Sequence, residues 1–211
     1  MRADTRGLGI AWTLMFAVGQ AAAGQSALSG LVRNGGGAVD NAAVYLIPLD
    51  GQAHVAADQR TTIDQVHLNF VPNVAVISPG SEVSFMNSDE VLHNVFGPGL
   101  GGVDGFDLGT YPRNAQRSWT FEQEGLHVVL CHIHPEMAAF IIVADTPHKT
   151  LTASDGSFTL GGVEPGRYRL HAWHPRHWRN EQTEEVLVTE DDLTGLVIRL
   201  GRTGNEPLPR P

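Results

Sequence analysis

The sequence predicts an all-β protein, and three observations point to this class. The 211 residues include 24 glycines and 12 prolines, which interrupt the chain too often for a helix bundle and are typical of a turn-rich β protein. Apolar residues occur in short runs bounded by turn residues, as they do in strands. No stretch of the sequence keeps the period of about 3.6 residues that an amphipathic helix requires. We therefore expect β-sandwich architecture wherever the chain folds.

The first 23 residues have the order of charged, apolar and small residues that is typical of a secretory signal peptide. Arg2 and Arg6 precede an apolar run at 8–18, and alanines occupy positions 21–23. The apolar run is shorter than the roughly 20 residues that a membrane span needs, which favours a cleaved signal over an anchor. We expect cleavage after Ala23 and a soluble mature protein in the periplasm.

The sequence predicts short strands between residues 24 and 145. The first turn signal lies at 34–37, and residues 50–60 are small and polar, which is typical of a loop. The glycine-rich segment 98–109 predicts a long surface loop. The predicted strands are 29–33 and 42–49, followed by 66–70, 75–77, 82–86, 92–96, 117–121, 127–131 and 139–143. The last seven match the number of strands expected of one sandwich.

After residue 145 the same pattern of strands returns. Asp155-Gly156 is a second hairpin signal. Residues 201–211 hold three prolines among polar residues and predict a flexible tail. The predicted strands are 151–153, 157–160, 167–173, 185–188 and 196–200.

Charge and cysteine content narrow the possible functions. The net charge of −9 argues against a nucleic-acid partner, because such proteins carry basic patches. A single cysteine cannot form an internal disulfide, and it stands beside ten histidines. This combination indicates metal chemistry.

One short segment and one distant histidine hold the candidate ligands. Cys131, His134 and Met137 follow an apolar strand at three-residue spacing, and His93 lies far upstream. One thiolate, two imidazoles and a weak thioether form the ligand set of a blue-copper site. A structural zinc site normally closes with four strong ligands, and methionine is not one of them. We predict a type 1 copper that cycles between Cu(II) and Cu(I), with two alternatives: Met137 packs the core instead, or Cys131 is a buried apolar thiol.

The motifs Asn87, His93-Asn94-Val95 and Cys131-x-x-His134-x-x-Met137 resemble the cupredoxin family, with a loop most similar to that of amicyanins. The resemblance covers roughly residues 62–145 and implies a Greek-key β-sandwich. It implies that His93, Cys131, His134 and Met137 bind copper. It also implies that Asn94 braces the two ligand loops by hydrogen bonding behind the ligands.

The flanks resemble a carboxypeptidase regulatory-like domain, which is a small transthyretin-like sandwich. The matching motifs are Ser29-Gly30-Leu31-Val32, Ala42-x-Val44, Asp155-Gly156-x-Phe158-x-Leu160 and Pro165-Gly166-x-Tyr168-x-Leu170. The resemblance implies a copper domain, 62–145, inserted in or packed beside a second sandwich made of 24–61 and 146–200. The whole arrangement is similar to exported proteins described as methylamine utilisation proteins, which implies electron transfer near an amine dehydrogenase.

We expect a periplasmic one-electron carrier that docks transiently with redox proteins of the dehydrogenase or cytochrome c type. A copper ion with a full ligand set has no position for substrate, so we expect no enzymatic turnover. After signal cleavage we expect neither a membrane nor a nucleic-acid partner. The alternatives are a copper-handling or sensing protein, and a copper oxidoreductase with a second copper at His132 or at His171, His174 and His177.

Other polar residues near the motif have less specific interpretations. His127 shares the strand face of Cys131 and is predicted to be a hydrogen-bonded core residue. His132 lies on the opposite face, either as a surface histidine or as a ligand or electron exit outside the main site. Asp89 and Glu136 are predicted to be solvated loop charges.

Overall fold

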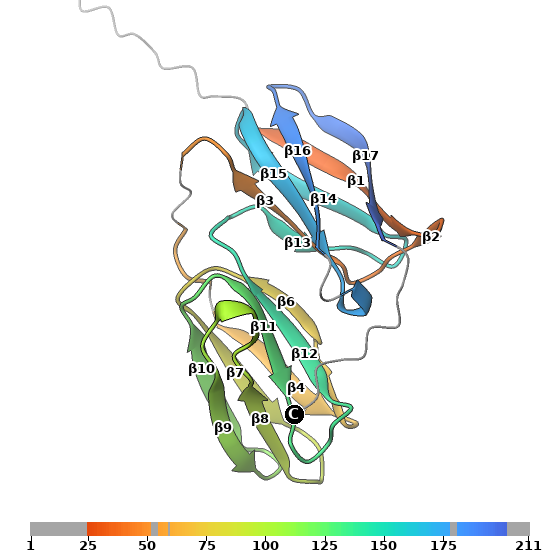
Figure 1. The fold of residues 1–211 in the computed structure, drawn as a ribbon. Helices are drawn as coiled ribbons and strands as arrows, with labels where there is room; N and C mark the ends of the chain where they lie inside the picture. The colour runs from red at the N-terminus through yellow and green to blue at the C-terminus, as the bar shows by residue number, and fades with distance from the viewer. Residues whose placement is uncertain (1–24, 52–54, 59, 178–180, 202–211) are drawn as a thin grey trace, which may run out of the picture.

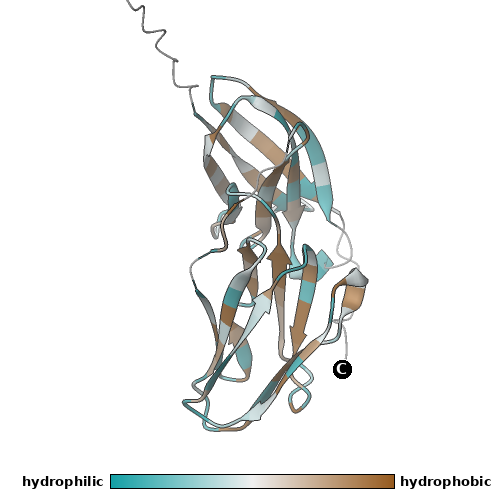
Figure 2. Ribbon diagram, turned by 90° about the vertical axis from the view of Figure 1, so that its left-hand side faces the viewer, coloured by the Kyte–Doolittle hydropathy of each residue, from teal (hydrophilic) through white to brown (hydrophobic). Residues whose placement is uncertain are grey.

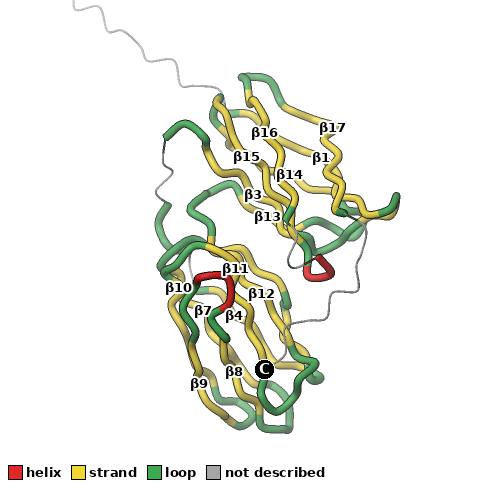
Figure 3. Tube along the Cα trace, in the orientation of Figure 1, coloured by secondary structure: helices red, strands yellow, loops and turns green. Residues whose placement is uncertain are grey.

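Strands make up almost all of the regular structure, which confirms the all-β class (Figure 1). The computed structural model describes residues 25–51, 55–58, 60–177 and 181–201. The predicted signal peptide and nearly all of the predicted tail lie outside these residues. In the part of the chain that the structure describes, the only helical segments are the 3-10 turns η1 (Leu100–Gly102) and η2 (Pro175–His177), red in Figure 3. None of the described residues forms a helix with the length and apolar content that a membrane crossing requires.

The strands within residues 26–48 and 149–200 form two sheets, here called the flanking sheets. One has the order β14-β1-β17 with β2 paired to β1, and the other has the order β13-β3-β15-β16. Their apolar faces enclose one core, which includes Leu28, Val32, Leu46 and Leu170. The strands are β1 (Ser26–Asn34), β2 (Gly37–Ala38), β3 (Ala43–Pro48), β13 (Lys149–Leu151), β14 (Ser157–Val163), β15 (Gly166–Trp173), β16 (Gln182–Val188) and β17 (Leu193–Leu200).

The chain between them forms two further sheets, here called the central sheets. Their orders are β10-β7-β4-β5 and β6-β12-β11-β8-β9. The core between them contains Phe85 and Phe121 together with Cys131 and Met137. The strands are β4 (Thr61–Val66), β5 (Asn69–Val71), β6 (Val74–Ile77), β7 (Ser81–Asn87), β8 (His93–Gly97), β9 (Phe106–Tyr111), β10 (Gln116–Phe121), β11 (Gly125–Leu130) and β12 (Ala138–Val143).

A third core joins the central to the flanking sheets. Val128 and Leu130 of β11 and Phe140 of β12 pack against Tyr45 and Trp173 of β3 and β15. Alternate residues of β11 and β12 point into the core between the central sheets, because successive side chains of a strand point to opposite faces. Both strands therefore read as nearly continuous apolar runs, since each of their faces is covered. Figure 2 shows hydrophobic strand segments, in brown, in both the upper and the lower part of the molecule.

Two strand boundaries predicted from the sequence are wrong. The predicted strand 66–70 is broken by a turn, because His67 and Leu68 adopt φ values of 51° and 60°, in the left-handed region. The predicted surface loop 98–109 contains the start of β9, in which Phe106 is buried and stacks on Trp119. The strand was missed because the many glycines of this segment are typical of a loop.

The long strands on either side of each of the two turn signals do not pair with each other. The turn after Asn34 pairs β1 with the two-residue β2, and β3 crosses to the other flanking sheet. The turn at Asp155-Gly156 leads from β13 to β14, and these two strands also belong to different sheets. Hairpin residues specify a tight reversal, but they do not specify the sheet that the next strand joins.

Candidate metal centre

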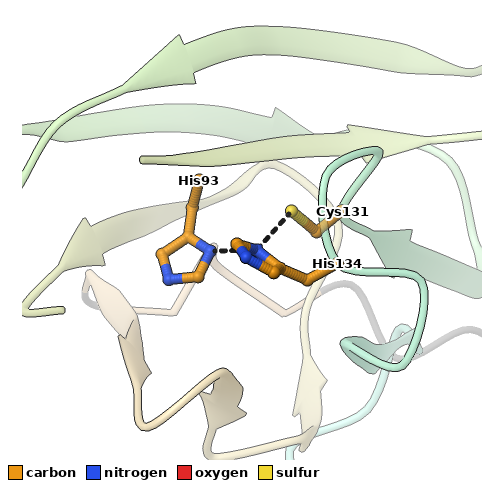
Figure 4. Close-up of side chains that lie close together, drawn as sticks. All are labelled: His93, Cys131 and His134. Atoms are coloured by element: carbon orange, nitrogen blue, oxygen red, sulfur yellow. Dashed lines mark hydrogen bonds between the residues drawn. The ribbon is translucent and has the colours of Figure 1, made fainter. Parts of the chain in front are cut away.

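Three ligand-capable side chains meet at one end of the central sheets (Figure 4). His93 opens β8, Cys131 follows β11 directly, and His134 lies in the loop that leads to β12. One ligand atom from each lies within 4.8 Å of the others. His93 and Cys131 are fully buried and His134 is half-buried. Among the residues that the structure describes, this is the one group of three such side chains close enough to share an ion.

The nitrogen and sulfur atoms of these side chains face one another. His134 Nδ1 lies 3.1 Å from His93 Nδ1 and 3.8 Å from Cys131 Sγ (Figure 4). The backbone N–H of Asn94 donates to Cys131 Sγ at 3.5 Å. A donor aimed at sulfur stabilises the thiolate, the form in which cysteine binds metals. The cluster therefore has the nitrogen and sulfur donor atoms that a metal requires.

Asp89 orients the imidazole of His93. Its Oδ2 lies 2.9 Å from His93 Nε2, and its carboxylate accepts the backbone N–H groups of His67 and Leu68. Partial burial acts to raise the pKa of Asp89, but the hydrogen bonds from Leu68, His93 and His67 together lower it. A carboxylate only accepts, so Nε2 carries the proton and Nδ1 offers a lone pair to the cluster.

The prediction that Asp89 is a solvated loop charge is therefore wrong. Its side chain is only 12% exposed, and it contacts a candidate ligand. The turn at residues 67–68 supplies two of its three hydrogen bonds, and the sequence interpretation had placed a strand there. Asn87 holds the same segment from the other side, because its Nδ2 donates to the carbonyls of Val91 and Tyr111.

Asn94 joins three parts of the centre. Its side chain donates to Asp107 Oδ1 of β9 at 2.9 Å, and its Oδ1 accepts the backbone N–H of His132 at 3.4 Å. Together with the bond from its backbone to Cys131 Sγ, these contacts tie β8 to the cysteine loop. The position corresponds to the bracing role that the family resemblance implies for Asn94.

Met137 is buried in the same core as Cys131. Its backbone N–H donates to the carbonyl of His134 at 3.0 Å, which closes the loop between β11 and β12. Burial next to the cysteine fits both an axial ligand and a packing residue. Ligation by Met137 stays a prediction, as does ligation by the other three residues.

The other histidines that the structure describes lie apart from this cluster. His127 is a buried core residue as predicted, with Nε2 2.7 Å from the carbonyl of Gln123, and burial lowers its pKa. His132 is exposed on the opposite face and stacks on Phe96, with ring centroids 3.6 Å apart. Glu136 is exposed, as predicted.

A second metal site at residues 171–177 finds no support in the described residues. His171, His174 and His177 each contact a different group and do not converge. His171 Nδ1 lies 3.1 Å from Glu181, His174 Nδ1 accepts the backbone N–H of Arg176, and His177 Nε2 lies 3.0 Å from Asn34 Nδ2. The spacing of three histidines in the sequence therefore does not produce a shared site.

Comparison with known proteins gives partial matches only. No family model matches the sequence, and no curated protein matches it. A Cu-containing nitrite reductase from Thermus scotoductus SA-01 aligns with a TM-score of 0.39 at 25% identity, over 46% of this chain and 25% of that one. A purple cupredoxin from Nitrosopumilus maritimus gives 0.37 at 21%, over 40% and 99% of the two chains. A reduced amicyanin variant gives 0.38 at 22%, over 50% and 100%.

Proposed function

We propose that this protein binds one copper ion through His93, Cys131, His134 and Met137 and carries single electrons between redox proteins in the periplasm. The observation that supports this most strongly is that one ligand atom each of His93, Cys131 and His134 lies within 4.8 Å of the others. They come from separate segments of the chain, and their types match a blue-copper ligand set.

The surroundings fit copper better than they fit an ordinary buried thiol. Two imidazole nitrogens and a thiol face one another, and a backbone N–H points at the sulfur. An unpaired thiol is at risk of oxidation in an extracytoplasmic compartment, and metal coordination would protect it. The chemistry that copper would supply when bound is one-electron transfer, through its Cu(I) and Cu(II) states.

The protein would contribute a ligand set that moves little during this exchange. Asp89 fixes the orientation of His93, and Asn94 fixes the cysteine loop relative to β8. Loops tied in this way would keep the same geometry for both oxidation states. The four proposed ligands leave no position for substrate, so we infer a carrier and not an enzyme.

Partner proteins would dock where the candidate ligands approach the surface. His134 is the partly exposed member of the cluster, and Ile133 beside it is exposed. Val91 and Leu92, next to His93, are also exposed. An apolar surface of this kind suits the transient docking of a dehydrogenase or a cytochrome c type protein.

Copper loading of the purified mature protein tests this proposal. We expect one copper per chain, intense blue absorption from thiolate-to-copper charge transfer, and rapid reversible reduction. Slow redox with ready loss of copper would favour a copper-handling or sensing protein. Two copper ions per chain would favour an oxidoreductase, and colourless binding would refute a type 1 site.

Substituting Asp89 with asparagine should weaken copper binding. The amide cannot hold the Nε2 proton of His93 as a carboxylate does, and loss of such a partner typically costs on the order of tenfold to a hundredfold in metal affinity. Competition with a chelator of known affinity measures the change. Glu90→Gln removes a charge from the neighbouring exposed residue and should leave affinity unchanged. Equal losses of copper affinity in Asp89→Asn and Glu90→Gln would mean that only the negative charge near the site matters, and not the contact between Asp89 and His93.

Substituting Met137 with leucine should raise the reduction potential. Losing the weak thioether ligand favours Cu(I), and we expect a rise of roughly 60 mV, a tenfold change in the ratio of the two oxidation states of a one-electron couple. A redox titration followed by blue absorption measures it. Met86→Leu makes the same replacement in β7 and should leave the potential unchanged. A wild-type potential in Met137→Leu would show that Met137 only packs the core.

A further inference from the structure

Tyr45 lies at the junction between the flanking and central sheets. It belongs to the third core, together with Trp173 and Phe140, and its side chain is almost completely buried. Trp173 packs against Phe140 with ring centroids 5.1 Å apart. Oxidisable aromatic rings of the flanking sheets therefore lie against the sheet that carries β11 and β12, shielded from solvent.

The hydroxyl of Tyr45 is hydrogen-bonded to a carboxylate, which can act as a base. It donates to Glu181 Oε1, and the other oxygen of that carboxylate lies 3.1 Å from His171 Nδ1. The imidazole of His171 is paired with Tyr45 across β3 and β15 and stacks on its ring, with centroids 4.5 Å apart and planes 13° apart. Phenol, carboxylate and imidazole thus form one connected cluster, distant in sequence from the candidate metal ligands.

The hydroxyls of the other two tyrosines of the chain donate to backbone carbonyls and not to a carboxylate. Tyr111 accepts a hydrogen bond from Gln65 and donates to the backbone carbonyl of Phe85. Tyr168 donates to the backbone carbonyl of Glu164. A backbone carbonyl cannot take up a proton near neutral pH, whereas a carboxylate can. Tyr45 is therefore the one tyrosine of the three that is hydrogen-bonded to a side chain able to receive its proton.

This difference matters because a phenol becomes strongly acidic when it loses an electron. Burial, followed by the nearby charge of Glu181, raises the pKa of Tyr45, so the resting residue is the neutral phenol. Oxidation then requires that the proton leave together with the electron. A positioned base lowers the barrier to such a proton transfer.

We propose that Tyr45 is a redox-active tyrosine, a one-electron site separate from the candidate metal centre. One electron passes from Tyr45 to an oxidising radical of the peroxyl class, and the phenolic proton moves to the carboxylate of Glu181. The products are a neutral tyrosyl radical, a protonated Glu181 and the reduced oxidant.

The test uses the full chain without metal, so its outcome is independent of the proposed copper function. A photogenerated ruthenium(III) polypyridyl complex supplies the oxidant, and rapid-freeze EPR identifies the radical. We expect a tyrosyl signal that is lost in Tyr45→Phe and retained in Tyr168→Phe, the matched control. In Glu181→Gln the rate of radical formation should fall by on the order of a hundredfold, because the amide accepts a hydrogen bond but not a proton.

Several results would overturn the proposal. These are a tyrosyl signal that persists in Tyr45→Phe, a radical found only on tryptophan or on Cys131, and an unchanged rate in Glu181→Gln. Circular dichroism of each variant confirms the fold beforehand. If Tyr45→Phe does not fold, the rate in Glu181→Gln decides the question, since this substitution keeps the size and hydrogen-bonding shape of the side chain.

Discussion

Substituting Cys131 with serine should abolish the blue absorption of the copper-loaded protein. The absorption arises from charge transfer between a thiolate and copper, and a serine hydroxyl provides no such donor. Cys131 is the only cysteine in the sequence, so no other thiolate can take its place. Visible spectroscopy at matched protein and copper concentrations measures the effect.

His132→Ala is the matched control for this substitution. His132 adjoins Cys131 in the chain, but its ring stacks on Phe96 on the opposite strand face. The variant should therefore keep its full colour. Full colour in Cys131→Ser would refute the assignment of Cys131 as a ligand, and loss of colour in His132→Ala would extend the site to the other face of β11.

Substituting Phe140 with alanine should destabilise the whole protein by about 3–5 kcal/mol, the usual cost of removing a buried phenyl ring. The side chain is 1% exposed and packs on Trp173, in the core shared by the central and flanking sheets. The melting temperature should fall by roughly 10 °C or more. Thermal or chemical unfolding of the protein measures both quantities.

Leu187→Ala provides the comparison for Phe140→Ala. Leu187 lies on the edge strand β16 with 64% of its surface exposed, so the change should stay within about 0.5 kcal/mol. Equal stability of Phe140→Ala and wild type would contradict a core shared between the two pairs of sheets. If Phe140→Ala unfolds in two separate transitions and the wild type in one, the shared core couples the unfolding of the central and flanking sheets.

The convergence of His93, Cys131 and His134 was predictable from the sequence, because it depends on rare residue types at a characteristic spacing. Cys131 and His134 are close in the chain, and only His93 had to be brought to them by the fold. The orientation of the candidate ligands could not be predicted from the sequence. Asp89 reaches His93 through a turn at His67 and Leu68, and this turn interrupts what looks like a continuous strand.

The strands of the fold were predictable where apolar residues cluster, but their partners were not. The apolar runs around Val129 and Ile141 indicate strands covered on both faces, and the sequence does not say what covers the second face. The structure supplies the answer with Tyr45 and Trp173 of β3 and β15. The assignment of the flanking segments to a carboxypeptidase regulatory-like domain stays a prediction.

X-ray absorption at the copper edge tests the central claim most directly, because it reports the atoms bound to the ion. For the purified protein loaded with one equivalent of copper, we predict one short bond to sulfur and two bonds to imidazole nitrogen. A first coordination sphere made only of nitrogen and oxygen would contradict the account, since Cys131 would then not bind the metal.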